Sequence, residues 1–354
     1  MGMVVLDWLE RLDPGTHRRI RGLRLVTAYG IAAMLGLMPQ IAQHAGHNVT
    51  LSVIAGSFAL WASVSENRAN RWQSSRDLVL FCGSAGLGAL SYVVLVRLLN
   101  VVGAAGLELP LVSGAFCVGY FKRFTPFSAG IGSQIFIGQL LAYNAGLRLD
   151  DVDVVVIATV IAMVAAVVPR LLSGPAEHPI LAVTTPVSTD FDDWLPIEFI
   201  MGLQAAAAAL VIVALNGEFG LEKSSWAICA CTFVITNSTV TTLARIRSRI
   251  LGTMVGVPLA IAFLPLAINA PLLVWAVAAI AMIIYAMAFP ERYDIACGAY
   301  AFALIVTLAV SGEHSFYELA ARTWETVVGG TLGMAAAVLL RPLFSRHRKS
   351  PADP

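Results

Sequence analysis

The chain has 354 residues, of which 58% are hydrophobic and only 13% are charged. A soluble domain carries roughly a quarter charged residues, so this excess of apolar side chains needs lipid rather than water as its solvent. The net charge of +1 gives no indication of nucleic-acid binding, and the spans predicted below leave no room for a large soluble domain.

The N-terminal segment, 1–21, lacks a long apolar run followed by a small-residue cleavage site, so we expect a cytoplasmic lead-in and no removable signal peptide. Apolar runs then predict a first membrane repeat over 22–170, with helices at 22–40, 48–65, 77–97, 101–121, 126–146 and 152–170. A second membrane repeat over 196–341 is predicted with helices at 196–216, 224–243, 249–268, 270–289, 293–311 and 322–341. The predicted fold class is all-α: a polytopic membrane protein with about twelve transmembrane helices in two tandem parallel six-helix repeats.

The segments between and after these repeats are predicted to be cytoplasmic. Three prolines break any helix in the linker at 171–195, and a basic tail follows at 342–354. With the N-terminus inside, every lysine and arginine falls in a cytoplasmic segment except Arg97, Arg148, Lys223 and Arg322. The positive-inside rule therefore predicts a multi-pass protein of the bacterial inner membrane with both termini in the cytoplasm.

Short motifs recur in the two repeats in the same order and at nearly constant separation. AMVAAVVPRL aligns with GMAAAVLLRP, and the paired positions are Met163 with Met334, Gly22 with Gly202, Gly83 with Gly252, and Gly132 with Gly298. An even number of spans gives both copies one orientation, and transporters often place a substrate path at such a repeat interface. Duplicated scaffolds without transport also exist.

Three segments of the second repeat resemble the fusaric acid resistance protein-like family, the aromatic acid exporter group: SSWAICACTFVIT at 224–236, RSRILGTMVGVPLA at 247–260 and ARTWETVVGG at 321–330. Many members carry a large cytoplasmic domain between two membrane halves, so this chain, with its short linker, resembles a compact form. The resemblance implies export of hydrophobic organic acids or drugs, commonly alongside a periplasmic adaptor protein.

Ionisable side chains within membrane helices are costly, so each one predicted here is a candidate for coupling or for the substrate path. Arg322 and Glu325 are three residues apart on one helical face and form the leading candidate pair for proton coupling; the alternative is an ion pair that anchors the last helix. Asp294 is either a coupling acid or a solvated helix start. Arg249 either captures an organic anion at the inner mouth or only follows the positive-inside rule.

Polar and small residues complete the set of candidates. Asn237 and Thr236 in the predicted helix at 224–243, Gln134 and Gln139 in the fifth helix, and Thr253 in the ninth either join helices or line the path. Small residues permit close helix packing at Gly83, Gly86, Gly252, Gly256, Gly329 and Gly333.

No phosphate-binding loop, hydrolase motif or metal-ligand spacing occurs in a suitable context, so we expect no enzyme activity, no cofactor and no metal. The leading hypothesis is a secondary transporter that exports aromatic or other hydrophobic organic acids or drugs, driven by protons. The alternatives are a non-transporting membrane scaffold or assembly protein and a passive channel. Expected partners are the small organic acid or drug, membrane lipid, a periplasmic adaptor and further copies in a homo-oligomer, with no nucleic acid.

Overall fold

A computed structural model describes residues 17–41, 48–68, 70–99, 104–173, 196–220, 224–289, 291–310 and 316–344. Within these ranges the chain is helical and has no β-strand, which confirms the all-α class. The first half contains α2 (His17–Leu37), α4 (Asn48–Ser65), α5 (Arg71–Leu99), α6 (Leu109–Tyr120), α7 (Pro126–Asn144) and α8 (Val152–Leu172). The second half contains α9 (Ile197–Phe219), α10 (Ser224–Val234), α11 (Thr239–Ala262), α12 (Leu264–Asn269), α13 (Pro271–Ala288), α14 (Tyr293–Val310) and α15 (Phe316–Phe344).

Local sequence signals set several of these helix ends. The Thr125 hydroxyl accepts from the Ser128 amide at 3.1 Å, and Pro126 follows at the first helical position of α7. α6 likewise begins next to a proline, Pro110, later than the predicted start at 101. Gly220 adopts φ 65°, the left-handed conformation that ends α9.

The chain is a membrane protein by the length and composition of its helices. Among the described residues, five helices are long and apolar enough to cross a membrane: Arg18–Leu37, Arg71–Leu99, Leu149–Leu172, Ile197–Phe219 and Leu319–Leu340. Four apolar helices are shorter, at Thr50–Ser65, Ser224–Val234, Leu272–Ala288 and Tyr293–Ala309. Twelve spans therefore stay a prediction, and most of the expected linker (174–195), of the lead-in (1–16) and of the basic tail (345–354) lies outside the described residues.

The α8 helix shows how these helices use their two faces. Val156, Val160, Val164 and Val168 recur every four residues and are exposed, whereas small residues such as Ala158 and Ala162 are fully buried. Large apolar side chains outside and small ones inside suit a helix that meets lipid on one face and packs closely on the other. The exposed valines thus agree with a membrane-embedded helix.

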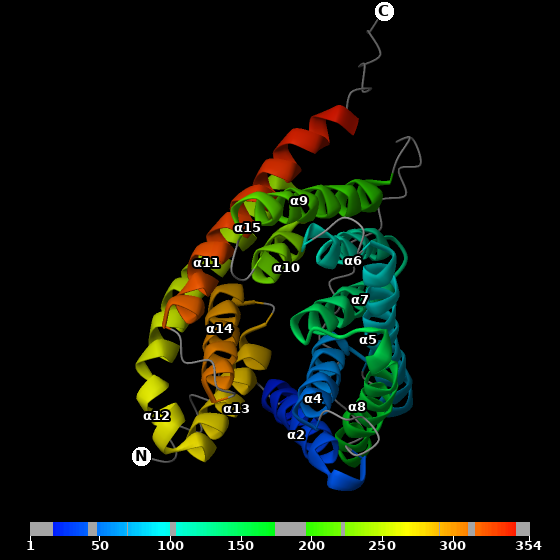
Figure 1. The fold of residues 1–354 in the computed structure, drawn as a ribbon, viewed down its shortest axis with the longest axis vertical. Helices are drawn as coiled ribbons and strands as arrows, with labels where there is room; N and C mark the ends of the chain where they lie inside the picture. The colour runs from blue at the N-terminus through cyan, green and yellow to red at the C-terminus, as the bar shows by residue number, and fades with distance from the viewer. Residues whose placement is uncertain are drawn as a thin grey trace, which may run out of the picture.

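Figure 1 shows two groups of helices that meet at two places. In the first half, α5 packs against α7 and α8, and α2 packs against α4 and α8. In the second half, α11 packs against α14 and α15, and α9 packs against α10 and α15. The halves contact each other mainly through α6 on α9 and through α13 on α2. The buried core is accordingly divided into separate clusters.

Candidate functional site

The predicted helices at 224–243 and 249–268 are wrong in their boundaries. α10 ends at Val234 and α11 begins at Thr239, so the residues between them are not helical. Hydroxyl groups satisfy the backbone at this break: Thr242 accepts from the Thr236 amide at 3.1 Å and donates to the Ser238 carbonyl at 2.8 Å. Serine and threonine compete with helical hydrogen bonds in this way. The polar residues around Thr236 and Asn237 therefore form a break between two helices, not the interior of one.

The short α10 helix is the centre of the candidate site. It has 11 residues, too few to span a membrane, and nearly all of them are buried. Interrupted helices in transporters commonly supply substrate and ion sites. Asn237 lies in the break after α10 rather than inside a helix and is exposed, and the Thr236 hydroxyl contacts neighbouring threonines, so neither residue joins the buried cluster described next.

Two buried arginines face α10 from neighbouring helices. Arg322 on α15 is 3% exposed, and its guanidinium lies over the rings of Trp226 (5.0 Å) and Tyr300 (5.9 Å). Arg249 on α11 is 8% exposed and donates to the sulfur of Cys229 at 3.7 Å. The two arginines thus contact residues of α10 that are three positions apart, Trp226 and Cys229. We call Arg249, Arg322, Glu325, Trp226 and Tyr300 the arginine cluster.

Glu325 supplies the negative charge of the arginine cluster. It is fully buried, one turn beyond Arg322 on α15, and attracts the Arg322 guanidinium. The cluster therefore holds two cations and one anion. Asp294, the other acid predicted for this role, instead pairs with the exposed Arg292 at 3.2 Å, so the structure does not bring it into the cluster.

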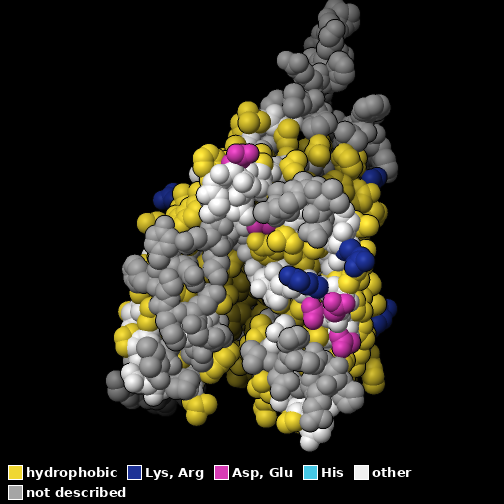
Figure 2. Space-filling view, viewed as in Figure 1, with side chains coloured by type: hydrophobic (Ala, Val, Ile, Leu, Met, Phe, Trp, Pro, Cys, Tyr) yellow, Lys and Arg dark blue, Asp and Glu magenta, His cyan; other side chains and the backbone are white. Residues whose placement is uncertain are grey.

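Aromatic rings connect the arginine cluster to the first half. Tyr300 contacts Trp61 of α4, with ring centroids 5.3 Å apart, and Tyr285 of α13, at 6.2 Å. Figure 2 shows a hollow lined by hydrophobic side chains where Figure 1 places α13 and α14 opposite α4 and α7. Trp61 and Tyr300 thus join helices that lie on opposite sides of this hollow.

Gln134 and Gln139 bind α7 to its neighbours. Gln134 donates to the Trp61 carbonyl at 2.8 Å and to the Ser65 hydroxyl at 2.9 Å. Gln139 donates to serine hydroxyls of α5 and α6. Their amide nitrogens therefore join helices, and Gln134 also holds the backbone of Trp61, whose ring contacts the arginine cluster.

The predicted small residues lie where helices approach closely. A Cβ on Gly252 would collide with the Asp294 carbonyl oxygen, and one on Gly256 with the Gly298 carbonyl, so α11 and α14 touch along their backbones. The buried Thr253 lies on this stretch of α11. Similar close approaches occur at Gly86 against Thr159, Gly329 against Ala227, and Gly333 against Val234, whereas Gly83 faces the flexible end of Met163.

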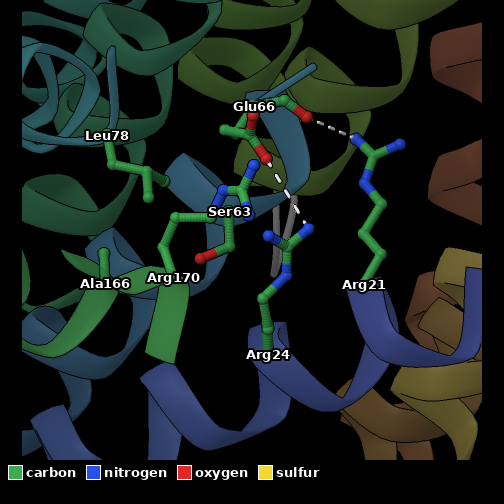
Figure 3. A pocket seen from close by; sticks show the side chains of 7 residues that line it. All are labelled: Arg21, Arg24, Ser63, Glu66, Leu78, Ala166 and Arg170. Atoms are coloured by element: carbon green, nitrogen blue, oxygen red, sulfur yellow. Dashed lines mark hydrogen bonds and ion pairs between the residues drawn. The ribbon is translucent and has the colours of Figure 1, made fainter. Parts of the chain in front are cut away.

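A second group of arginines, in the first half, was predicted only as an orientation signal. Figure 3 shows Arg21 and Arg24 of α2 and Arg170 of α8 around Glu66. Arg24 pairs with the Glu66 carboxylate at 3.8 Å, and Arg21 donates to the Glu66 carbonyl oxygen at 2.9 Å. We call this group the basic pocket. The spacing of Arg21 and Arg24, three residues apart on one helix, is the signal that could have indicated it.

Residues 205–336 match the family model described as fusaric acid resistance protein-like. The matched segment begins within α9 and ends within α15, so it contains α10 and all of the charged residues of the arginine cluster. No curated protein and no solved structure matches the chain. The resemblance expected from the motifs of the second half is confirmed for this segment.

Proposed function

We propose that this chain, whose residues 205–336 are similar to the fusaric acid resistance protein-like family, is a secondary transporter that exports aromatic or other hydrophobic organic acids or drugs. The observation that carries the proposal is the arginine cluster. A guanidinium binds a carboxylate through two parallel hydrogen bonds, and aromatic rings offer contact area to an apolar body. The cluster therefore holds recognition groups for both parts of an aromatic carboxylate.

The charge balance of the cluster favours an anion. Among its described residues the cluster buries two guanidinium groups and one carboxylate, Glu325, so an anionic ligand would balance the remaining positive charge. An uncompensated buried charge costs about 3–5 kcal/mol, which an anionic cargo would offset when it binds. A membrane scaffold has no use for such a costly site, so this balance favours transport over the scaffold alternative.

The membrane potential favours the outward movement of an anion. An interior potential of about −100 mV contributes about 2.3 kcal/mol for each negative charge that leaves, or roughly fiftyfold accumulation outside. Exchange for one entering proton moves a second charge in the same electrical direction and doubles that contribution. Proton-driven export is therefore feasible in magnitude.

The two halves are proposed to be tandem copies with the cargo path between them. The contacts of α5 with α7 and α8 parallel those of α11 with α14 and α15, and α6 on α9 parallels α13 on α2. The paired glycines fall on corresponding helices: Gly83 on α5 with Gly252 on α11, and Gly132 on α7 with Gly298 on α14. These parallels support the duplication inferred from the motifs.

The remaining expectations belong to the same proposal. They are an inner-membrane location with both termini in the cytoplasm, no enzyme activity, and assembly as a homo-oligomer with a periplasmic adaptor. The distribution of lysine and arginine supports the orientation. The family resemblance supports the adaptor.

Cellular accumulation of labelled aromatic acids tests the proposal. Cells with the protein should accumulate less label than cells without it, and a protonophore should abolish the difference. Glu325→Gln should change the difference in accumulation between cells with and without the protein, because the substitution removes a negative charge from the arginine cluster. Accumulation that is unchanged across a panel of aromatic acids would favour a scaffold, and flux that ignores the protonophore would favour a channel.

A further inference from the structure

A second buried carboxylate lies where the two halves meet. Glu108, the residue before α6, is 1% exposed. Its Oε1 atom accepts hydrogen bonds from the Tyr143 hydroxyl of α7 (2.7 Å), the Asn216 amide of α9 (2.8 Å) and the Ser224 hydroxyl of α10. Its Oε2 atom is buried and has no hydrogen-bond partner among the described residues. Donors from both halves therefore converge on one oxygen, and the other lacks a hydrogen bond in the described part of the chain.

Helix capping does not account for Glu108. The residue occupies the N-cap position of α6, yet its side chain makes no capping hydrogen bond. Its partners in the described part of the chain are two hydroxyls and an amide, none of them a cation. A buried carboxylate without a cation is costly, and an acceptor without a donor adds to that cost. A proton on Oε2 would remove the charge.

Among the described residues, the ionisable groups near Glu108 are two tyrosines. Tyr143 donates to it from α7, and the ring of Tyr92 on α5 packs against Tyr143 with centroids 6.2 Å apart. From α9 and α10 the facing groups are Asn216 and Ser224, which do not titrate. Glu108 is therefore the acid of this group, and we call Glu108, Tyr143, Asn216 and Ser224 the carboxylate centre.

Export in exchange for protons needs a proton site outside the arginine cluster. Within the cluster, a proton on Glu325 frees positive charge on Arg322 for an anion, so proton and anion favour each other's binding. Two ligands that bind cooperatively travel in the same direction, which is the opposite of exchange. This step rests on the proposed function.

The short α10 helix connects the carboxylate centre to the arginine cluster. Ser224 binds Glu108, the ring of Trp226 lies under Arg322, and the sulfur of Cys229 contacts Arg249. These three residues lie within two turns of one buried helix. A change in the bond to Ser224 therefore acts on the helix that holds both arginines in place.

We propose that Glu108 is the proton-binding site that couples anion export to proton entry. A proton taken from water on one side of the membrane binds Oε2 and is later released to water on the other side. Hydrogen bonds to a charged carboxylate are roughly twice as strong as those to a neutral group, so the bound proton weakens the three bonds that link α7, α9 and α10. The protonated state thereby loosens the contact between the halves, and the deprotonated state restores it.

Infrared difference spectra of the full-length protein in lipid vesicles test proton binding without any cargo. As the pH is lowered, each acid that takes up a proton adds the carbonyl stretch of a carboxyl group, and one of these bands, that of Glu108, should be missing from Glu108→Gln. The matched control is Glu218→Gln, an exposed acid on α9, which should keep the band. Tyr143→Phe removes one donor from the charged form, so its band should appear at a higher pH. A band that persists in Glu108→Gln, or one unmoved in Tyr143→Phe, would overturn the assignment.

Transport measurements then test coupling. Glu108→Gln should lose the accumulation driven by a proton gradient and keep the exchange of labelled for unlabelled cargo in the absence of a gradient. Gradient-driven accumulation that survives in Glu108→Gln contradicts the proposal. If the unaltered protein moves no aromatic acid, the proposed function fails, and the infrared result still decides whether Glu108 binds a proton.

Discussion

The arginine cluster and the basic pocket both bury arginines, but they satisfy them differently. In the basic pocket, Arg170 is 1% exposed and donates to the Ser74 hydroxyl at 2.7 Å and to the Arg68 carbonyl at 3.3 Å. In the arginine cluster, the faces of Arg322 lie on aromatic rings, and its Nε has no hydrogen-bond partner among the described residues. Oxygen atoms of the protein thus accept from the donors of Arg170, whereas the Nε–H group of Arg322 is left for an oxygen of a ligand.

This difference shows that burial alone does not identify a functional arginine. A buried guanidinium needs acceptors for its five N–H groups. Where the protein supplies them, as for Arg170, the side chain holds helices together. Where aromatic rings cover the guanidinium faces and one N–H group has no acceptor, as at Nε of Arg322, that group can donate to another molecule.

The largest expected effect is on transport, from the double variant Arg322→Met with Glu325→Gln. It removes one positive and one negative charge together, so the net charge of the arginine cluster does not change. Loss of two charge-assisted hydrogen bonds of about 1.5–3 kcal/mol each should lower transport of an aromatic acid by roughly 100-fold or more. Uptake into inverted vesicles measures the loss, and thermal unfolding in detergent should change little. Normal transport by this variant would show that Arg322, like Arg170, has no part in binding the cargo.

Arg170→Met should show the reverse pattern. Removal of a guanidinium bound to protein oxygens leaves buried acceptors such as Ser74 without their donor and should lower the free energy of unfolding by about 2–4 kcal/mol. Transport per folded molecule should stay unchanged. Arg170→Lys is the control, because an ammonium reaches fewer of these acceptors and should recover only part of the stability. A stable but inactive Arg170→Met would place the basic pocket in the transport path.

A smaller effect on stability and transport is expected when the close packing of α11, the helix that carries Arg249, is disturbed. Gly252→Ala places a Cβ against the Asp294 carbonyl oxygen, which cannot move without its helix, so we expect a loss of about 1–3 kcal/mol and reduced transport as α11 shifts. Gly83→Ala is the matched substitution in the first half. Its Cβ would lie 3.3 Å from the flexible end of Met163, so stability should be unchanged or higher by up to about 1 kcal/mol. Equal losses in denaturant unfolding would contradict this difference.

The smallest expected effect is on stability, from the exposed ion pair between Arg18 and Glu291. Arg18 of α2 binds Glu291, which follows α13, and this contact lowers the pKa of Glu291 below its ordinary value of 4.5. The contribution is complete above that value and is lost as the pH falls through the lower, folded-state pKa. Glu291→Gln should cost less than about 1 kcal/mol because the pair is exposed. The free energy of unfolding of Glu291→Gln, measured across the acidic pH range, should differ from that of the unaltered protein only above the folded-state pKa of Glu291.

Apolar runs bounded by polar residues were sufficient to predict most helices. Those predicted at 48–65, 126–146 and 152–170 correspond closely to α4, α7 and α8, because the length of a membrane helix is set by its apolar solvent. Helical periodicity also placed Arg322 and Glu325 on one face. The break between α10 and α11 was missed, because a threonine-rich segment can be a polar helix or a set of local caps, and only its neighbours decide between them.

The sequence by itself determined that the chain is a helical membrane protein, where most helices lie and which family the second half resembles, since these follow from local composition and motifs. Only the tertiary structure decided which arginines meet protein oxygens and which meet aromatic rings, because those partners come from distant helices. The same holds for Glu108: its donors lie 35, 108 and 116 residues away in the chain. Burial and hydrogen bonding depend on such long-range contacts, and a single sequence does not state them.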